Sequence, residues 1–213
     1  MIYHIITIFP DIYHSFLNSS LIKRAVDSDR ISVRIYNLRD FAKDSRKTID
    51  APPYGGGAGM VLMAEPICLA INSIKKGKDV PTIIFSPKGK LLDQKSVREY
   101  SALSEVVLIC PRYEGFDERI ITLTKATELS IGNYILMGGD TPAMVFIETT
   151  SRLIPGVVGK EESIKNESFS EDDYLEHPQF TRPQIFQGQK VPLVLVSGNH
   201  GEIEKWKRDP HHN

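Results

Sequence analysis

The segment at residues 108–119 combines residue types that could bind a polar ligand. It reads L-I-C-P-R-Y-E-G-F-D-E-R, so an apolar run ends in a cluster of charged side chains. Open α/β sheets bind ligands at the carboxyl ends of their strands, and a strand here would deliver Arg112, Tyr113 and Glu114 to that edge. Asp117 and Glu118 also suit the positive end of a helix. A helix N-terminus accounts less well for Arg112, Tyr113 and Glu114.

A second candidate, residues 130–142, holds three glycines in a chain that must bend repeatedly. It reads S-I-G-N-Y-I-L-M-G-G-D-T-P and also follows a predicted strand. Such a chain can wrap a planar ligand with its own amide and carbonyl groups. Asp140, which precedes Thr141 and Pro142, predicts a helix N-cap with proline in the first turn.

A third candidate is the glycine-rich run at residues 53–60, P-Y-G-G-G-A-G-M. Its glycines let backbone amides approach a ligand where a side chain would collide. The run lacks the spacing of the dinucleotide-binding G-x-G-x-x-G motif and of the G-x-x-x-x-G-K-[ST] phosphate loop. Taken alone, it also fits a flexible loop between two elements.

Two isolated residues, Arg152 and Glu167, could carry catalysis, although each also fits a solvated surface position. The sequence contains no H-E-x-x-H, G-x-S-x-G or paired-cysteine motif, which argues against zinc enzymes and serine hydrolases. We predict no metal site. Cys68 and Cys110 lie in apolar runs and are expected to be buried thiols.

Short apolar runs alternate with helix-like segments through the first 150 residues, a pattern typical of an α/β domain with a largely parallel sheet. We expect strands at residues 3–9, 31–36, 82–85, 106–109 and 128–130. We expect helices at residues 10–17, 65–74, 93–103 and 141–153. Residues 160–176 are acidic and weakly patterned, which indicates a linker or lid. A small unit with an apolar stretch at 191–196 and a basic helix at 202–208 follows.

The charge balance gives no global signature of a nucleic-acid-binding protein, because 26 basic and 27 acidic residues leave a net charge of −1. Basic residues do cluster locally, at residues 43–47 and 205–208. No apolar run is long enough to span a membrane, and the first ten residues lack the features of a signal peptide. We therefore expect a cytoplasmic protein.

Taken together and in this order, the motifs resemble the bacterial tRNA (guanine-N1)-methyltransferase family, TrmD. The match starts with I-I-T-I-F-P and continues through P-Y-G-G-G-A-G-M, S-P-K-G, R-Y-E-G-F-D-E-R, S-I-G-N-Y-I-L-M-G-G-D-T-P-A-M, R-L-I-P-G-V, H-P-Q-F-T-R-P and V-S-G-N-H to Trp206. Each motif alone is modest, but the series is highly specific and covers nearly the whole chain.

The resemblance implies a SPOUT-type α/β fold: a parallel sheet with a C-terminal trefoil knot, plus a small, mainly helical C-terminal domain. Composition could not have predicted a knot, because chains are unknotted by default. The implied parts are an S-adenosylmethionine-binding domain at residues 1–159, an acidic linker or lid at 160–176 and a shortened tRNA-contacting domain at 177–213. The implied assembly is a homodimer with its active site at the subunit interface.

The resemblance also implies S-adenosylmethionine as the methyl donor. Its binding residues would be Ser86, Pro87, Pro111, Tyr113, Glu114, Ile131, Gly132, Asn133, Tyr134, Ile135, Leu136, Gly138, Gly139 and Pro142.

The activity implied is methyl transfer to N1 of the guanosine at tRNA position 37, beside the anticodon. Guanine N1 carries a proton at neutral pH, so the reaction needs a base for that proton and a cation near O6. The family motif places the cation at Arg152. Its base is the aspartate of a D-S-F triplet, which here reads E-S-F, so Glu167 becomes the expected base. Asp172 and Asp173 are alternatives.

The family motifs further imply a surface that binds the RNA, with the target base extruded from its stack. The expected RNA-binding residues are Lys43, Arg46, Lys47, Tyr54, Gly57, Ala58, Gly59, Arg182, Asn199 and His200. Two departures from the family pattern are Pro111, where glycine is common, and Ala58, where proline is usual. The chain also ends soon after Trp206, which we expect to affect tRNA binding more than methyl-donor binding.

Three other functions remain open at this point. A nucleotide-binding oxidoreductase would fit the alternating elements, although G-x-G-x-x-G is missing. A non-catalytic RNA-binding module would fit the altered Pro111 and Glu167. A different SPOUT enzyme, acting on another RNA site, would not need the pair of Arg152 and a carboxylate.

Overall fold

The fold is taken from a computed structural model, which describes residues 1–159, 167–170 and 174–209. The chain divides into two compact units, Met1–Gly159 and Lys160–Asn213. Most of the predicted linker lies outside the described residues, as do the alternative bases Asp172 and Asp173.

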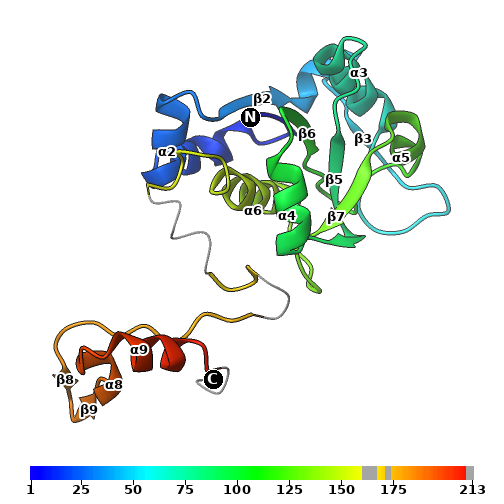
Figure 1. The fold of residues 1–213 in the computed structure, drawn as a ribbon. Helices are drawn as coiled ribbons and strands as arrows, with labels where there is room; N and C mark the ends of the chain where they lie inside the picture. Colours follow the sequence, from blue (N-terminus) through cyan, green and yellow to red (C-terminus); the bar gives the residue numbers. More distant parts are fainter. Residues whose placement is uncertain (160–166, 171–173, 210–213) are drawn as a thin grey trace. The chain divides into compact units, whose positions relative to one another are not determined.

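A five-stranded sheet forms the centre of the first unit (Figure 1). Its order is β2 (Ser32–Asn37), β1 (Ile2–Thr7), β6 (Glu105–Ile109), β5 (Thr82–Leu91) and β7 (Thr127–Ser130). All neighbouring strands in it are parallel. The five predicted strands are therefore all present, and the α/β class with a parallel sheet is confirmed.

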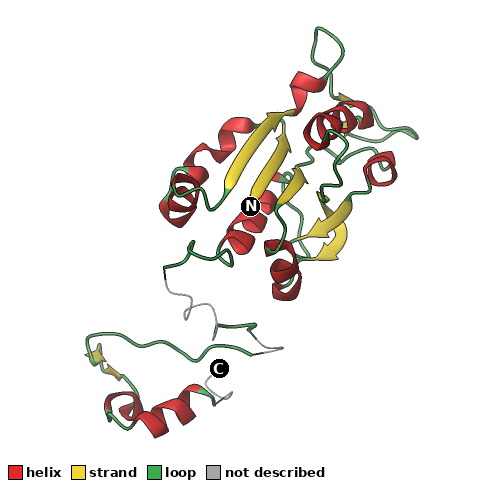
Figure 2. Cartoon of the chain, turned by 45° about the horizontal axis from the view of Figure 1, so that its top comes forward, coloured by secondary structure: helices red, strands yellow, loops and turns green. Residues whose placement is uncertain are grey.

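Helices cover both faces of this sheet (Figure 2). One face carries η1 (Pro10–Tyr13), α1 (His14–Leu17), α2 (Ser20–Asp27), α4 (Gln94–Ser101) and α6 (Asp140–Ser151). The other carries η2 (Leu38–Phe41), α3 (Ala64–Lys75) and α5 (Arg119–Thr124).

Strand residues alternate between the two hydrophobic cores because successive side chains of a strand point to opposite faces. In β1, Tyr3 and Ile5 belong to the core under α6, whereas Ile6 belongs to the core under α3. In β6, Leu108 and Ile109 divide in the same way. Burial on both faces explains why these strands read as continuous apolar runs in the sequence.

Strand β5 contains an irregularity that the sequence did not predict. Both Phe85 and Lys90 pair with Leu129 of β7, so residues 86–89 loop out between them. Gly89 permits the close approach, because a Cβ there would lie 2.4 Å from the Leu129 backbone nitrogen. The predicted strand at 82–85 ends where this loop begins, and the loop contains Ser86 and Pro87.

Several predicted helices are correct, with changes at their ends. The helix expected at residues 10–17 is divided into η1 and α1, and α6 begins one residue before the predicted start. Helices α2 and α5 were not predicted from the sequence. A short antiparallel pair, β3 (Asp50–Ala51) with β4 (Val61–Leu62), was not predicted either; it brackets the glycine-rich run.

The described part of the second unit contains a hairpin, β8 (Ile185–Phe186) with β9 (Gln189–Lys190), and two helices, α8 (Leu193–Val196) and α9 (His200–Lys207). The predicted basic helix corresponds to α9. The ring centroid of Trp206 lies 5.7 Å from that of His177 and 6.2 Å from that of Phe180. Nowhere in the described residues is a helix both long and apolar enough to cross a membrane.

Candidate active site

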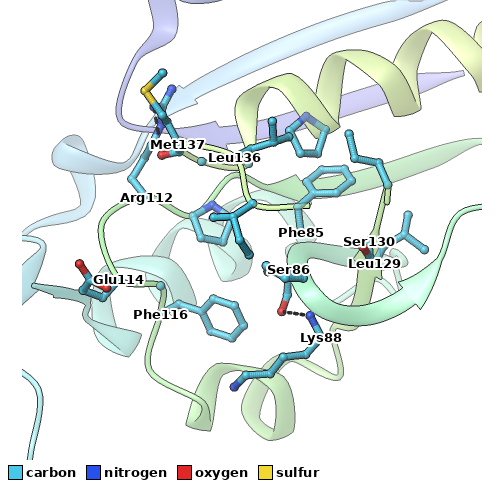
Figure 3. Close-up of a pocket in the computed structure, with 18 of the residues that line it drawn as sticks. Phe85, Ser86, Lys88, Arg112, Glu114, Phe116, Leu129, Ser130, Leu136 and Met137 are labelled. Atoms are coloured by element: carbon cyan, nitrogen blue, oxygen red, sulfur yellow. Dashed lines mark hydrogen bonds between the residues drawn. The ribbon is translucent and has the colours of Figure 1, made fainter. Parts of the chain in front are cut away.

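A pocket of about 400 Å³ lies where β5, β6 and β7 end or loop out (Figure 3). Three chain segments build it: residues 85–88 from the β5 loop, 111–118 after β6, and 129–142 from β7 to the first turn of α6. They meet because the carboxyl ends of parallel strands share one edge of the sheet.

The pocket brings together nearly all residues expected to bind the methyl donor. All of them line it except Asn133. Phe85 and Arg112, which belong to the expected methyl-donor loops, line it too. Further lining residues were not predicted from the sequence: Lys88, Gly115, Phe116, Glu118, Leu129, Ser130 and Met137. Their place in the same motifs, or directly before one in the case of Leu129, was the signal that could have found them.

Two glycines let the loop before α6 lie directly against the segment after β6. A Cβ on Gly138 would lie 2.9 Å from the Pro111 carbonyl oxygen, and one on Gly139 would lie 2.7 Å from the Cys110 Cα. The Gly139 amide also donates to the Pro111 carbonyl at 2.8 Å. Pro111, which stands where glycine is common in the family, therefore still accepts this hydrogen bond through its carbonyl.

Charged side chains around the pocket are mostly paired. Arg112 contacts the buried Asp140, and Lys88 contacts Glu118 across the rim. Glu114 has no cationic partner within the described residues. The lining thus offers one carboxylate to a cationic ligand.

The structure corrects the expected role of Asp140. Gly139, and not Asp140, is the N-cap of α6, and the Asp140 side chain is 1% exposed. Its carboxylate accepts from Thr7 and Tyr13 instead of capping its own helix. A long-range network prevails here over the local N-cap preference.

Neither Cys110 nor Tyr13 supplies an ionised group to the site at neutral pH. Burial raises the pKa of Tyr13, with Cys110 and Asp140 adding to the effect, and burial also raises the pKa of the Cys110 thiol. The two side chains lie 3.2 Å apart behind the pocket. Cys110 is buried as predicted, whereas Cys68 is only half-buried.

The glycine-rich run lies against the pocket segment. The Glu114 amide donates to the Met60 carbonyl at 3.0 Å, and a Cβ on Gly59 would lie 2.5 Å from the Glu114 Cγ. Tyr54 is fully exposed at 101%, with Gly57 and Ala58 close to it in the chain. The loop therefore presents an aromatic ring to solvent while its end contacts the pocket wall.

The predicted basic RNA contacts differ in their partners. Lys43 pairs with Glu65 and Lys47 with Asp40, whereas Arg46 has no ion pair within the described residues. All three lie in the first unit, in the chain that leads to the glycine-rich run.

Arg152 lies far from the pocket of its own chain. It is the C-cap of α6, whose first turn lines the pocket, and it is not among the lining residues. A helix rises about 1.5 Å per residue, so the two ends of this helix are about 18 Å apart. Within one unit, the arginine and the pocket do not form one site.

The remaining predicted residues belong to the second unit. In the predicted E-S-F triplet, Ser168 Oγ accepts from the Glu176 amide, and the Phe169 amide donates to the Tyr174 carbonyl at 2.7 Å, so Glu167 leads a compact turn. Asn199 is the N-cap of α9, where its side chain accepts from the Glu202 amide. His200 begins that helix, and Arg182 is exposed.

The fold and the pocket define an α/β protein with a pocket at the carboxyl edge of its parallel sheet, lined in part by glycine-rich turns. The whole chain, residues 1–213, matches the family model described as tRNA (Guanine-1)-methyltransferase TrmD. The chain belongs to this family.

Relatives named tRNA (guanine-N(1)-)-methyltransferase agree with this assignment. The one from Clostridioides difficile is 46% identical over 212 residues, which cover 98% of this chain and 91% of the relative. The one from Caldanaerobacter subterraneus subsp. tengcongensis is 46% identical, with 98% and 86% covered. The one from Carboxydothermus hydrogenoformans is 47% identical, with 96% and 80% covered.

Proposed function

We propose that this protein transfers a methyl group from S-adenosylmethionine to N1 of the guanosine at position 37 of tRNA. Family membership supports the tRNA guanine and the N1 atom. The observation that carries the choice of methyl donor is that one pocket gathers the residues expected to bind it, from three separate segments that follow different strands.

The pocket suits S-adenosylmethionine in shape and charge. Gly138 and Gly139 let the turn before α6 lie against the end of β6, and these two segments together form one wall of the pocket for S-adenosylmethionine. The molecule carries a net charge of +1 at neutral pH, from its sulfonium, ammonium and carboxylate groups. Glu114, the lining carboxylate without an ion-pair partner in the described residues, complements that charge.

In the proposed reaction, the sulfonium supplies an activated methyl group. The guanine N1 electron pair forms the new N–C bond, the S–C electron pair stays on sulfur, and the N1 proton passes to a carboxylate. Glu167 is the proposed base, and Arg152 the proposed cation that stabilises charge on O6. Residues 177–213, which belong to the second unit, would contact tRNA together with the glycine-rich run.

A homodimer is part of this proposal. Arg152 and the pocket lie at opposite ends of α6, so one chain alone does not place the arginine beside the methyl donor. A second copy could bring its own arginine to the pocket, which supports a site shared between subunits. The trefoil knot and a cytoplasmic location rest on family membership.

The test is transfer of labelled methyl from S-adenosylmethionine to an unmodified tRNA transcript with guanosine at position 37. The matched substrate carries adenosine at that position. Methylation of the first transcript only, at N1 by nucleoside analysis, is the expected result. Methylation of both would assign another RNA site, and methyl-donor and tRNA binding without transfer would assign a non-catalytic module.

A further inference from the structure

Asp140 carries a carboxylate that is almost completely buried behind the pocket, with donors from three other segments. Thr7 Oγ1 donates to Oδ1 at 2.5 Å, and the Tyr13 hydroxyl donates to the same oxygen at 3.0 Å. Arg112 donates to Oδ2 through Nε at 2.8 Å, and its Nη2 lies 2.6 Å from the same oxygen in an ion pair. A buried carboxylate is unfavourable unless it is paired and hydrogen-bonded, and here both oxygens are.

Arg112, the charged partner, lies along the turn that closes the pocket (Figure 3). Its Nη1 donates to the Met137 carbonyl at 3.4 Å, and its Cδ fills the space where a Cβ of Gly138 would lie. The Phe9 ring covers the guanidinium from another side, 4.7 Å from its centre to Cζ. The position of Arg112 therefore sets the position of residues 137–138.

An acidic residue in the first turn of a helix is often explained by the helix dipole. That explanation does not require burial, a guanidinium partner or hydrogen bonds from the end of β1 and from η1. The three hydrogen bonds and the ion pair together hold the carboxylate in one place, and the contacts of Nε and Nη2 with Oδ2 orient the guanidinium.

We propose that Asp140 is a positioning residue for methyl transfer: it holds Arg112 against residues 137–138 and so sets the shape of the methyl-donor pocket. This inference rests on the proposed function, because it takes the ligand of the pocket to be S-adenosylmethionine. Asp140 does not line the pocket, so its effect on binding passes through Arg112.

The experiment is a double-mutant cycle on the full chain, with S-adenosylmethionine binding measured by calorimetry and folding by thermal melting. Asp140→Asn removes the charge and keeps the size of the side chain. We expect at least tenfold weaker binding, with unchanged affinity for tRNA. Arg112→Met should also weaken binding, and the double variant should bind no worse than Arg112→Met, because both changes disturb the same contact.

The matched control is Asp117→Asn, which disrupts another aspartate–arginine pair, with Arg119, on the surface next to the pocket segment. It should bind S-adenosylmethionine within twofold of the wild type. If Asp140→Asn does not fold, the double variant still decides, since it leaves no unpaired charge buried.

The possible outcomes separate the inference from the proposed function. No binding of S-adenosylmethionine by the wild type would contradict the proposed function itself. Binding by the wild type, with Asp140→Asn or Arg112→Met within twofold of it, would overturn the inference alone. A double variant tenfold weaker than Arg112→Met would also overturn it, because Asp140 would then act independently of the arginine.

Discussion

Replacing Gly139 by alanine should disturb the pocket through lack of space and not through backbone strain. Gly139 has φ −82°, which any residue can adopt. However, a Cβ there would lie 2.7 Å from the Cys110 Cα and 2.9 Å from the Pro111 nitrogen. Both are backbone atoms at the end of β6, so no side-chain rotation can relieve the overlap and the two segments must separate.

Overpacking of this kind costs about 1–3 kcal/mol. If the pocket loop absorbs the whole cost, S-adenosylmethionine binding weakens by roughly fivefold to a hundredfold. Calorimetry of Gly139→Ala measures the loss. Gly159→Ala is the matched control, because its Cβ would meet no atom within 4 Å, and it should bind as the wild type does.

The refuting result is binding by Gly139→Ala within twofold of the wild type. It would mean that the close contact between residue 139 and the end of β6 does not shape the pocket. A lower melting temperature with unchanged binding would lead to the same conclusion, since the strain would then fall on the fold and leave the ligand site unaffected.

Three further outcomes are expected. Glu167→Gln should lower the rate of methyl transfer at least a hundredfold and leave the affinity for S-adenosylmethionine unchanged, and Arg152→Ala should have the same effect. A variant that keeps the wild-type rate in single-turnover assays would show that its residue has no catalytic role. Burial lowers the pKa of His4 in the folded protein, so the unfolded chain binds a proton at this imidazole more readily. The free energy of unfolding should therefore fall as the pH drops below about 6.5, the ordinary pKa of histidine. Denaturant unfolding of His4→Asn should show a smaller fall over the same pH range. A thiol reagent should modify the half-buried Cys68 before Cys110, whose thiol should react only on unfolding; mass mapping that finds Cys110 modified first would contradict this.

The parallel sheet could be predicted because its signal is local. Strands buried on both faces appear as short apolar runs, and all five were found from that pattern. Helix α5 was missed because it has only six residues and offers few positions for a periodic pattern. Helix α2 has eight residues, as many as the correctly predicted α4, so its length does not explain why it was missed. The loop in β5 was missed because it depends on pairing with Leu129, which is distant in the sequence.

The pocket could be predicted in part, for a different reason. Its three segments carry motifs whose types and order point to a family, although no local rule says that they meet. Asp140 shows the limit of local reasoning. Its neighbours Thr141 and Pro142 favour an N-cap, but the donors that fix its carboxylate come from Thr7 and Tyr13. Those contacts exist only once the sheet has formed.

Helix α6 links these observations. Its first turn forms part of the pocket and holds Asp140, while Arg152 follows its last residue, about 18 Å away at 1.5 Å per residue. Reacting atoms must come within about 3–3.5 Å of each other, and a group that stabilises the developing charge must lie at hydrogen-bond distance. A rigid helix cannot bring its own two ends together, so Arg152 could act at this pocket only from another copy of the chain. Mixing subunits that carry Arg152→Ala with subunits that carry Gly139→Ala tests this directly. Partial recovery of activity in the mixture is expected if each site draws on two chains, and no recovery would restrict the site to one.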